Sequence, residues 1–157
     1  MIDKKIRNFT TGFFIIIAVI ISINFAMSYW KPGPYSLLAL LNDNKELGGY
    51  PSQVPVNSST SLYVYIENHE NKIALYQIKI YIVNSSFIVN STHYPNWKPY
   101  YIFYDLINNN QNDTIPFNVT FNKQGDYKIV ILLYMFNGTN FVFTGLYNQL
   151  YINSTVA

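Results

Sequence analysis

Residues 74–82 read Ala-Leu-Tyr-Gln-Ile-Lys-Ile-Tyr-Ile, and this stretch decides the fold of the chain. The pattern alternates along its whole length: one face would carry Ala74, Tyr76, Ile78, Ile80 and Ile82, and the other Gln77, Lys79 and Tyr81. Alternation with a period of two predicts a β-strand that buries one face in an apolar core. The β-branched and aromatic composition favours the same assignment.

Similar stretches lie on both sides of this one. Residues 63–66 and 127–134 are equally rich in β-branched and aromatic residues. Further strands are expected at residues 35–41, 87–89, 100–107, 114–121 and 141–152. Turn-forming clusters separate the strands, at residues 42–44, 48–51, 67–71, 108–112, 124–126 and 137–138.

This spacing predicts the class of fold. Seven or eight short strands in residues 35–157, with no helix long enough for a parallel crossover, predict an immunoglobulin-like antiparallel β-sandwich in an all-β domain. Tyr127 follows a Gly-Asp turn at the start of a long apolar strand. It therefore occupies a place that resembles the tyrosine corner of such sandwiches.

The N-terminal part of the chain has a different pattern. The 23 positions between Arg7 and Lys31 contain no charged residue, and about 20 such residues suffice for a helix to cross a bilayer. We therefore expect one transmembrane signal-anchor helix at residues 11–30 and a linker at residues 31–34. A cleaved signal peptide is the alternative, but its apolar core would be shorter, at about 7 to 15 residues.

Charge predicts the orientation of this anchor. Lys4, Lys5 and Arg7 precede the span and only Lys31 follows it closely. By the positive-inside rule, residues 1–10 are cytoplasmic and residues 35–157 are extracellular, which gives a single-pass protein of the cell membrane.

Glycosylation motifs support an external location. With 20 Asn and 20 Ser or Thr, chance predicts roughly 2.5 Asn-x-Ser/Thr sequons, whereas the chain has eight. Asn8 precedes the anchor and should be unmodified. The candidates for N-linked glycans are Asn57, Asn84, Asn90, Asn112, Asn118, Asn137 and Asn153, of which Asn118 is doubtful because it falls within an expected strand. A conformational preference of Asn, Ser and Thr for turns is the alternative explanation.

The sequence lacks the residues that most catalytic chemistry needs. Only 11% of residues are charged, against about 25% in average chains, and there is no Cys. This excludes a thiolate metal site and an electrostatic nucleic-acid binder. His69 and His93, with Glu67 or Glu70, lack ligand-pair spacing, and no Gly-x-Ser-x-Gly elbow is present. We expect no catalytic residues, no bound metal and no cofactor.

Two longer segments carry a family resemblance. Gly49-Tyr50-Pro51-Ser52 leads into Val56-Asn57, and residues 63–70 read Tyr-Val-Tyr-Ile-Glu-Asn-His-Glu. With the later Gly125-Asp126-Tyr127-Lys128 and the closing residues 150–153, this pattern resembles an archaeal membrane-protein family catalogued as domain of unknown function 1616. The resemblance covers about residues 35–154. It implies an external β-sandwich on a membrane anchor and no reaction, with Asn68, His69 and Glu70 shaping a turn through bonds to the backbone.

These observations favour a non-catalytic, membrane-anchored, extracellular β-sandwich. We expect it to act by adhesion or assembly with cell-surface proteins, namely a surface layer, a filament or its own kind. An accessory subunit of a larger respiratory or transport complex is the alternative, in which Ser22 and Asn24 would bond to neighbouring helices.

Overall fold

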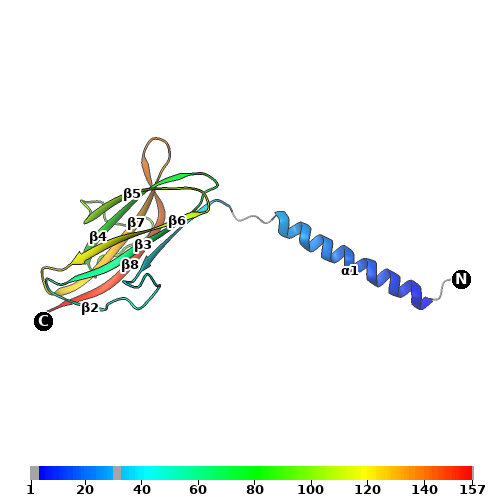
Figure 1. Cartoon of the computed structure of the whole chain (residues 1–157), viewed down its shortest axis with the longest axis horizontal. Helices are drawn as coiled ribbons and strands as arrows, with labels where there is room; N and C mark the ends of the chain where they lie inside the picture. Colours follow the sequence, from blue (N-terminus) through cyan, green and yellow to red (C-terminus); the bar gives the residue numbers. More distant parts are fainter. Residues whose placement is uncertain (1–3, 30–32, 157) are drawn as a thin grey trace. The chain divides into compact units, whose positions relative to one another are not determined.

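A computed structural model of the chain describes residues 4–29 and 33–156. The chain divides into two compact units at the junction of Gly33 and Pro34, and each unit is described by itself. The N-terminal unit is one helix, α1 (Lys4–Tyr29), of 26 residues (Figure 1). Its described side chains are those of Phe13 and residues 15–27.

Two polar side chains of α1, Ser22 and Asn24, bond to carbonyl oxygens of the helix itself. Ser22 Oγ donates to the carbonyl oxygen of Ala18, and Asn24 Nδ2 donates to that of Ile20, each at 2.8 Å. Among the described helical residues, none of the segments combines the length and the apolarity needed to cross a membrane. Residues 1–3 and 30–32, which belong to the predicted cytoplasmic end, anchor and linker, lie outside the described residues.

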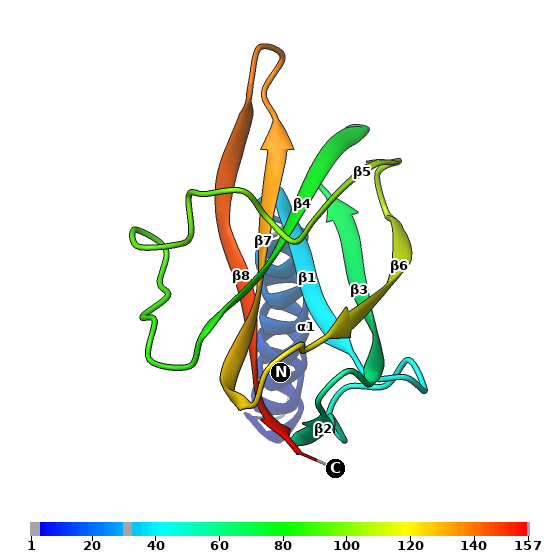
Figure 2. The same cartoon turned by 90° about the vertical axis from the view of Figure 1, so that its left-hand side faces the viewer.

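The C-terminal unit is a β-sandwich of eight described strands. They are β1 (Tyr35–Leu41), β2 (Gln53–Pro55), β3 (Ser59–His69), β4 (Ala74–Asn84), β5 (Tyr101–Ile107), β6 (Gln111–Thr120), β7 (Gly125–Phe136) and β8 (Phe141–Thr155). One sheet has the order β1-β3-β6 and the other β2-β8-β7-β4-β5 (Figures 1 and 2). All pairs are antiparallel except β2 with β8, so the predicted all-β class is confirmed.

Several details of the strand prediction were wrong. β3 continues through residues 67–69, which were predicted in a turn, because they pair with residues 35–37 of β1. Residues 87–89 form no strand, because the Phe87 backbone N bonds to Asn84 O in a turn. The side chain of Val89 is buried although its backbone joins no sheet. β2 was missed, since three residues ending in Pro55 are too few to show a period. β6 begins at Gln111, within the predicted turn cluster, because Asn110 closes that turn with a φ of 61°.

The main core lies between the two sheets. Leu62, Val64 and Ile66 of β3 are fully buried there, opposite Ile78 and Ile80 of β4. The face of β4 predicted to be apolar is therefore the inner face. Each fully buried side chain of this size contributes roughly 1.5–3 kcal/mol relative to exposure.

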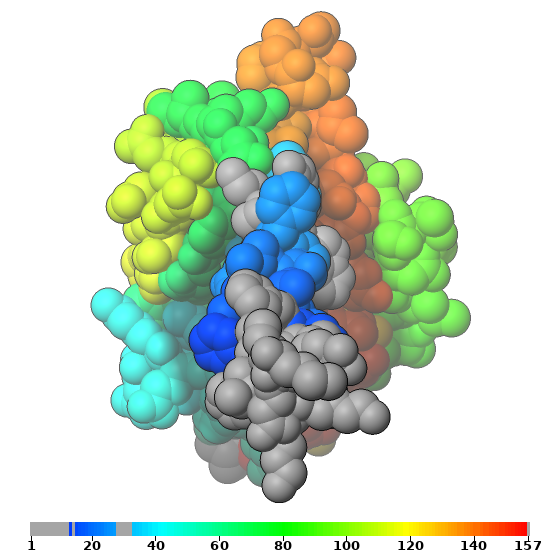
Figure 3. Space-filling view, turned by 90° about the vertical axis from the view of Figure 1, so that its right-hand side faces the viewer, coloured from blue at the N-terminus to red at the C-terminus, as the bar shows by residue number. Residues whose placement is uncertain are grey.

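A second apolar cluster covers the outer face of the five-stranded sheet. Its buried members are Tyr81, Val83, Val89, Val130, Leu132 and Tyr134. The loop of residues 85–100 between β4 and β5 supplies Val89 and partly buried Phe87 and Tyr94 to this cluster, and it projects beside the sheet in Figures 2 and 3. Because both faces of β7 are covered, its sequence is apolar almost without interruption, where a half-exposed strand would alternate.

The corner before β7 contains the expected tyrosine contact. Tyr127 Oη donates to the carbonyl oxygen of Lys123 at 3.2 Å, and the Tyr127 ring packs 4.9 Å from that of Phe121. A hydroxyl that bonds to the backbone a few residues upstream is the defining contact of a tyrosine corner. That expectation from the sequence is confirmed.

Candidate functional site

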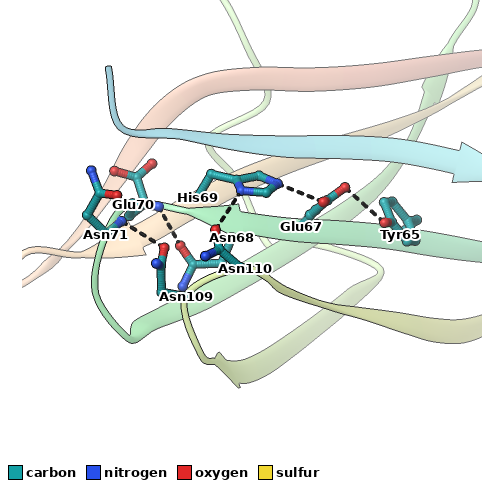
Figure 4. A network of polar contacts seen from close by, with 8 residues as sticks. All are labelled: Tyr65, Glu67, Asn68, His69, Glu70, Asn71, Asn109 and Asn110. Atoms are coloured by element: carbon teal, nitrogen blue, oxygen red, sulfur yellow. Dashed lines mark hydrogen bonds and ion pairs between the residues drawn. The ribbon is translucent and has the colours of Figure 1, made fainter. Parts of the chain in front are cut away.

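A polar network surrounds the end of β3 (Figure 4). His69 Nε2 lies 2.7 Å from Glu67 Oε1, and His69 Nδ1 lies 3.0 Å from Asn110 Oδ1 in the β5–β6 turn. The His69 ring stacks on Tyr35 of β1 with 4.6 Å between ring centroids. The hydrogen bond to Glu67 raises the pKa of His69 and lowers the pKa of Glu67.

The contacts of this network fix the position of the His69 ring. Both ring nitrogens of His69 lie within hydrogen-bond distance of oxygen atoms of the protein, and these contacts hold the ring against Glu67 and the β5–β6 turn. His93 belongs to another region, where it stacks on Phe87 at 5.2 Å. Within the described residues, no group of three His, Cys, Asp or Glu side chains could hold a metal ion.

Asn68 is the second-last residue of β3, and its side chain holds the turn that follows the strand. Its side chain is fully buried, and Nδ2 donates to the carbonyl oxygens of Lys72 at 2.8 Å and of Ile107 at 2.7 Å. Its Oδ1 accepts from the Glu70 backbone N at 2.9 Å. One side chain therefore joins the β3–β4 turn to the end of β5.

Glu70, the third residue of the predicted turn motif, contacts a different strand. Its Oε1 accepts a 2.7 Å hydrogen bond from Ser36 Oγ on β1, and that hydroxyl also lies 2.7 Å from Tyr76 Oη. The Tyr76 side chain is fully buried, so these bonds satisfy its hydroxyl within the core. Asn68, His69 and Glu70 thus reach three different parts of the sandwich.

An apolar strip lies on the outward face of β5. Ile102, Tyr104 and Leu106 are 44%, 59% and 60% exposed, and β5 pairs only with β4 because it is the edge strand of its sheet. The strip continues onto the β7–β8 hairpin, because the rings of Tyr104 and Phe141 lie 5.5 Å apart and those of Phe141 and Phe136 lie 5.3 Å apart. We call Ile102, Tyr104, Leu106, Phe136 and Phe141 the β5 strip.

Polar groups border the β5 strip on the side of β4. Gln77 Nε2 donates to Tyr104 Oη at 2.8 Å, and Lys79, paired with Ile102, places its Nζ 4.2 Å from the centroid of the Tyr134 ring. An apolar centre with a polar border is the arrangement found in protein–protein interfaces. Sequence reasoning missed the strip because alternation along β5 does not show which face the rest of the chain covers.

The seven predicted glycosylation sites all belong to the sandwich. Asn57, Asn84, Asn90, Asn112, Asn118 and Asn137 are exposed, whereas Asn153 is half-buried. Asn118 lies within β6, as the sequence predicts, and Asn112 lies near the start of the same strand.

The fold and this surface define an immunoglobulin-like β-sandwich domain with a candidate contact face. The chain belongs to the family described as Domain of unknown function (DUF1616), whose model matches residues 31–141. This match confirms the resemblance found in the sequence. No curated protein matches the chain significantly.

Solved structures show the same fold at low identity. The CARDB domain of a Pyrococcus furiosus protein, crystallised with di-metal ions, is 14% identical, with a TM-score of 0.55 over 80% of this chain and 96% of that one. A mutant β-glucosidase from Listeria innocua with laminaribiose is 11% identical, with a TM-score of 0.51 over 81% of this chain. The match covers only 17% of the glucosidase, so it concerns one domain of that enzyme.

Proposed function

We propose that this chain is a non-catalytic, membrane-anchored, extracellular β-sandwich protein that acts by adhesion or assembly with cell-surface proteins. Its partner is a surface-layer protein, a filament protein or a second copy of the chain. The proposal combines the sandwich fold, the uncharged segment between Arg7 and Lys31, and the excess of sequons in residues 57–153.

The observation that carries the proposal is the β5 strip. Single exposed apolar residues are ordinary on protein surfaces, but contiguous exposed apolar side chains mark contact sites. Tyr104 and Leu106 are each more than half exposed, and their neighbours Phe136 and Phe141 extend the same surface. Aromatic residues are also the most frequent binding hot spots.

The surroundings of the strip suit a protein partner. The surface near it is bordered by Gln77 and Lys79, whose polar ends already have partners within the domain. The charged end of Lys79 already lies over the ring of Tyr134. This cation–π contact offsets part of the cost of covering the Lys79 charge with a partner.

The test is a pull-down of tagged, full-length protein from its own membranes, followed by mass spectrometry. The double variant Tyr104→Ser and Leu106→Ser removes the most exposed part of the strip. We expect recovery of the partner to fall more than about tenfold, which corresponds to about 1.4 kcal/mol of binding free energy. Leu47→Ser is the matched control, because Leu47 is 75% exposed and lies outside the strip.

Two results would count against this function. If the double variant and the control recover the same partner equally, the strip is not the contact surface. If the protein separates with the soluble fraction, the proposed membrane anchor is wrong. Normal strand content of the double variant by circular dichroism excludes unfolding as the cause of lost binding.

The hydrogen bonds of α1 give little support to the alternative function, an accessory subunit of a membrane complex. Its support was that Ser22 and Asn24 would bond to neighbouring helices, but both donate to carbonyl oxygens of α1 itself. These donors are satisfied without a partner helix. The same pull-down separates the two functions, since stoichiometric integral membrane partners favour the subunit.

A further inference from the structure

The predicted glycosylation sites differ in how each Asn side chain is held. In two of them, the Asn Oδ1 accepts hydrogen bonds from both the backbone and the hydroxyl of the residue two positions later. Asn84 Oδ1 accepts from Ser86 N at 2.9 Å and from Ser86 Oγ at 2.7 Å. Asn90 Oδ1 accepts from Thr92 N and Thr92 Oγ1, each at 2.9 Å.

This arrangement decides where the amide nitrogen points. Because Oδ1 and Nδ2 are on opposite branches of one planar group, an Oδ1 held against the turn directs Nδ2 away from it. Asn84 and Asn90 are both exposed, and their Nδ2 atoms make no hydrogen bond to any described residue. Each nitrogen is therefore open to an approaching sugar donor.

The reaction places a demand on this nitrogen. N-linked transfer forms a bond between Nδ2 and the anomeric carbon of a phosphate-linked sugar on a lipid carrier. The bond from that carbon to the phosphate oxygen breaks, the phosphate leaves with the electron pair, and one Nδ2 proton passes to a base of the transferase. Nδ2 must therefore be accessible and free of other bonds.

Two other sites lie within strand ladders. Asn153 is half-buried in β8, and its Nδ2 donates to Asp126 Oδ1 at 2.5 Å. Asn118 lies within β6, where its Oδ1 accepts from Ser61 Oγ of the paired strand β3 at 2.8 Å. In both sites all three residues of the sequon are paired in a strand ladder, which a transferase would have to open. Asn84 is instead the last residue of β4, and its sequon continues into a turn.

We propose that Asn84 and Asn90 carry N-linked glycans and that Asn118 and Asn153 stay bare. The inference rests on the proposed extracellular location, and it identifies the acceptors among the candidates. Asn137 Oδ1 also accepts backbone bonds, from Thr139 N at 3.0 Å and from Asn140 N at 2.9 Å. Among the described residues, Asn57, Asn112 and Asn137 are exposed but lack the hydroxyl contact to Oδ1, so we rank them below Asn84 and Asn90 as acceptors.

The two acceptors are placed away from most of the proposed contact surface. Asn84 pairs with Tyr127 at one end of β4, whereas Leu106 of the β5 strip pairs with Leu75 near the other end. Asn90 follows in the loop of residues 85–100. Glycans at these positions would cover one end of the sandwich and leave Leu106 and Tyr104 accessible to a partner.

The test is glycopeptide mass spectrometry of full-length protein from its own membranes, with fragmentation that keeps each sugar on its Asn. We expect glycans at Asn84 and Asn90 and unmodified Asn118 and Asn153. Asn84→Gln and Asn90→Gln should each remove one glycan mass, and Asn118→Gln and Asn153→Gln should remove none. Thr92→Ala should remove the glycan at Asn90, and the matched variant Thr92→Ser should keep it.

Other outcomes overturn the proposal in distinguishable ways. Equal occupancy of all seven sites would show that conformation does not select the acceptor, and the extracellular location would stand. Bare Asn84 and Asn90 with a glycan at Asn118 or Asn153 would reverse the proposed order. No glycan at any site would overturn the inference, and the pull-down with the β5 variants would then decide the proposed function separately.

Discussion

His69 Nε2 lies 2.7 Å from Glu67 Oε1, two residues earlier on the same face of β3. The other ring nitrogen faces Asn110 Oδ1, so both nitrogens face acceptors. A neutral imidazole has only one N–H, and the doubly protonated form satisfies both contacts. The contact with Glu67 is the main reason that the pKa of His69 is raised.

The variant Glu67→Gln should lower the pKa of His69, because it removes the charged acceptor of the Nε2 proton. An NMR titration of the His69 ring protons measures this change. Glu70→Gln is the matched control, since the Glu70 carboxylate accepts a hydrogen bond from Ser36 instead of from the His69 ring. An unchanged pKa of His69 in Glu67→Gln would contradict the role given to the hydrogen bond.

The same pair predicts a pH window of stability. Because the pKa of His69 is raised above 6.5, its contribution is full below about 6.5 and is lost as the pH rises through the folded pKa. Because the pKa of Glu67 is lowered from 4.5, its contribution is lost as the pH falls below that value. The pair therefore stabilises the fold most between about pH 4.5 and 6.5, by a small amount because both side chains contact water.

Asn68→Ala should destabilise the sandwich by about 1–3 kcal/mol. The change removes both hydrogen bonds to the carbonyl oxygens of Lys72 and Ile107 and leaves the buried groups unsatisfied. Urea denaturation followed by circular dichroism measures the loss. Asn109→Ala is the control, because Asn109 accepts one exposed bond from Asn71 N and should cost less. Equal losses in the two variants would contradict this account.

Asp105→Asn should stabilise the domain at neutral pH. Asp105 Oδ2 is buried and has no hydrogen-bond partner among the described residues. Burial, and then the charge of Asp113, raise the pKa of Asp105, so ionisation destabilises the fold as the pH rises from about 3.8 through the folded pKa. Denaturation midpoints at pH 4 and pH 7 should differ less in the variant than in the original chain.

The control for Asp105 is Asp43→Asn, since Asp43 is exposed in the turn after β1. This variant should leave the difference between the two pH values unchanged. A lower midpoint for Asp105→Asn at pH 7 would mean that the ionised carboxylate is stabilising.

Tyr127→Phe should cost about 0.5–1.5 kcal/mol, the usual net contribution of one hydrogen bond. The ring would keep its packing against Phe121 and lose only the bond from Oη to Lys123 O. Tyr147→Phe is the matched control, because Tyr147 is partly buried and its hydroxyl makes no hydrogen bond within the described residues. Thermal denaturation of both variants compares the two losses. Equal midpoints would show that the hydrogen bond from Tyr127 to Lys123 does not stabilise the fold.

Local patterns in the sequence determined the class of fold. Alternation in residues 74–82 predicts β4 correctly, and the apolar residues 127–134 predict β7, because a strand has a period that single residues reveal. Tyr127 could be placed because its contact with Lys123 spans only four residues. The family resemblance likewise rested on short segments. The turn predicted at Asn68, His69 and Glu70 begins later than expected, because Asn68 and His69 pair with β1 at the end of β3.

Contacts between distant residues were decided only by the tertiary structure. The bond from Asn68 to Ile107, the approach of Asp105 to Asp113, and the loop of residues 85–100 over the outer face all depend on strand order. Strand order depends on which apolar faces pack together in three dimensions. The alternating pattern of a single strand does not predict that order. The sequence therefore determined which residues form strands, whereas the packing of the two sheets decided that Ile102, Tyr104 and Leu106 stay exposed at an edge.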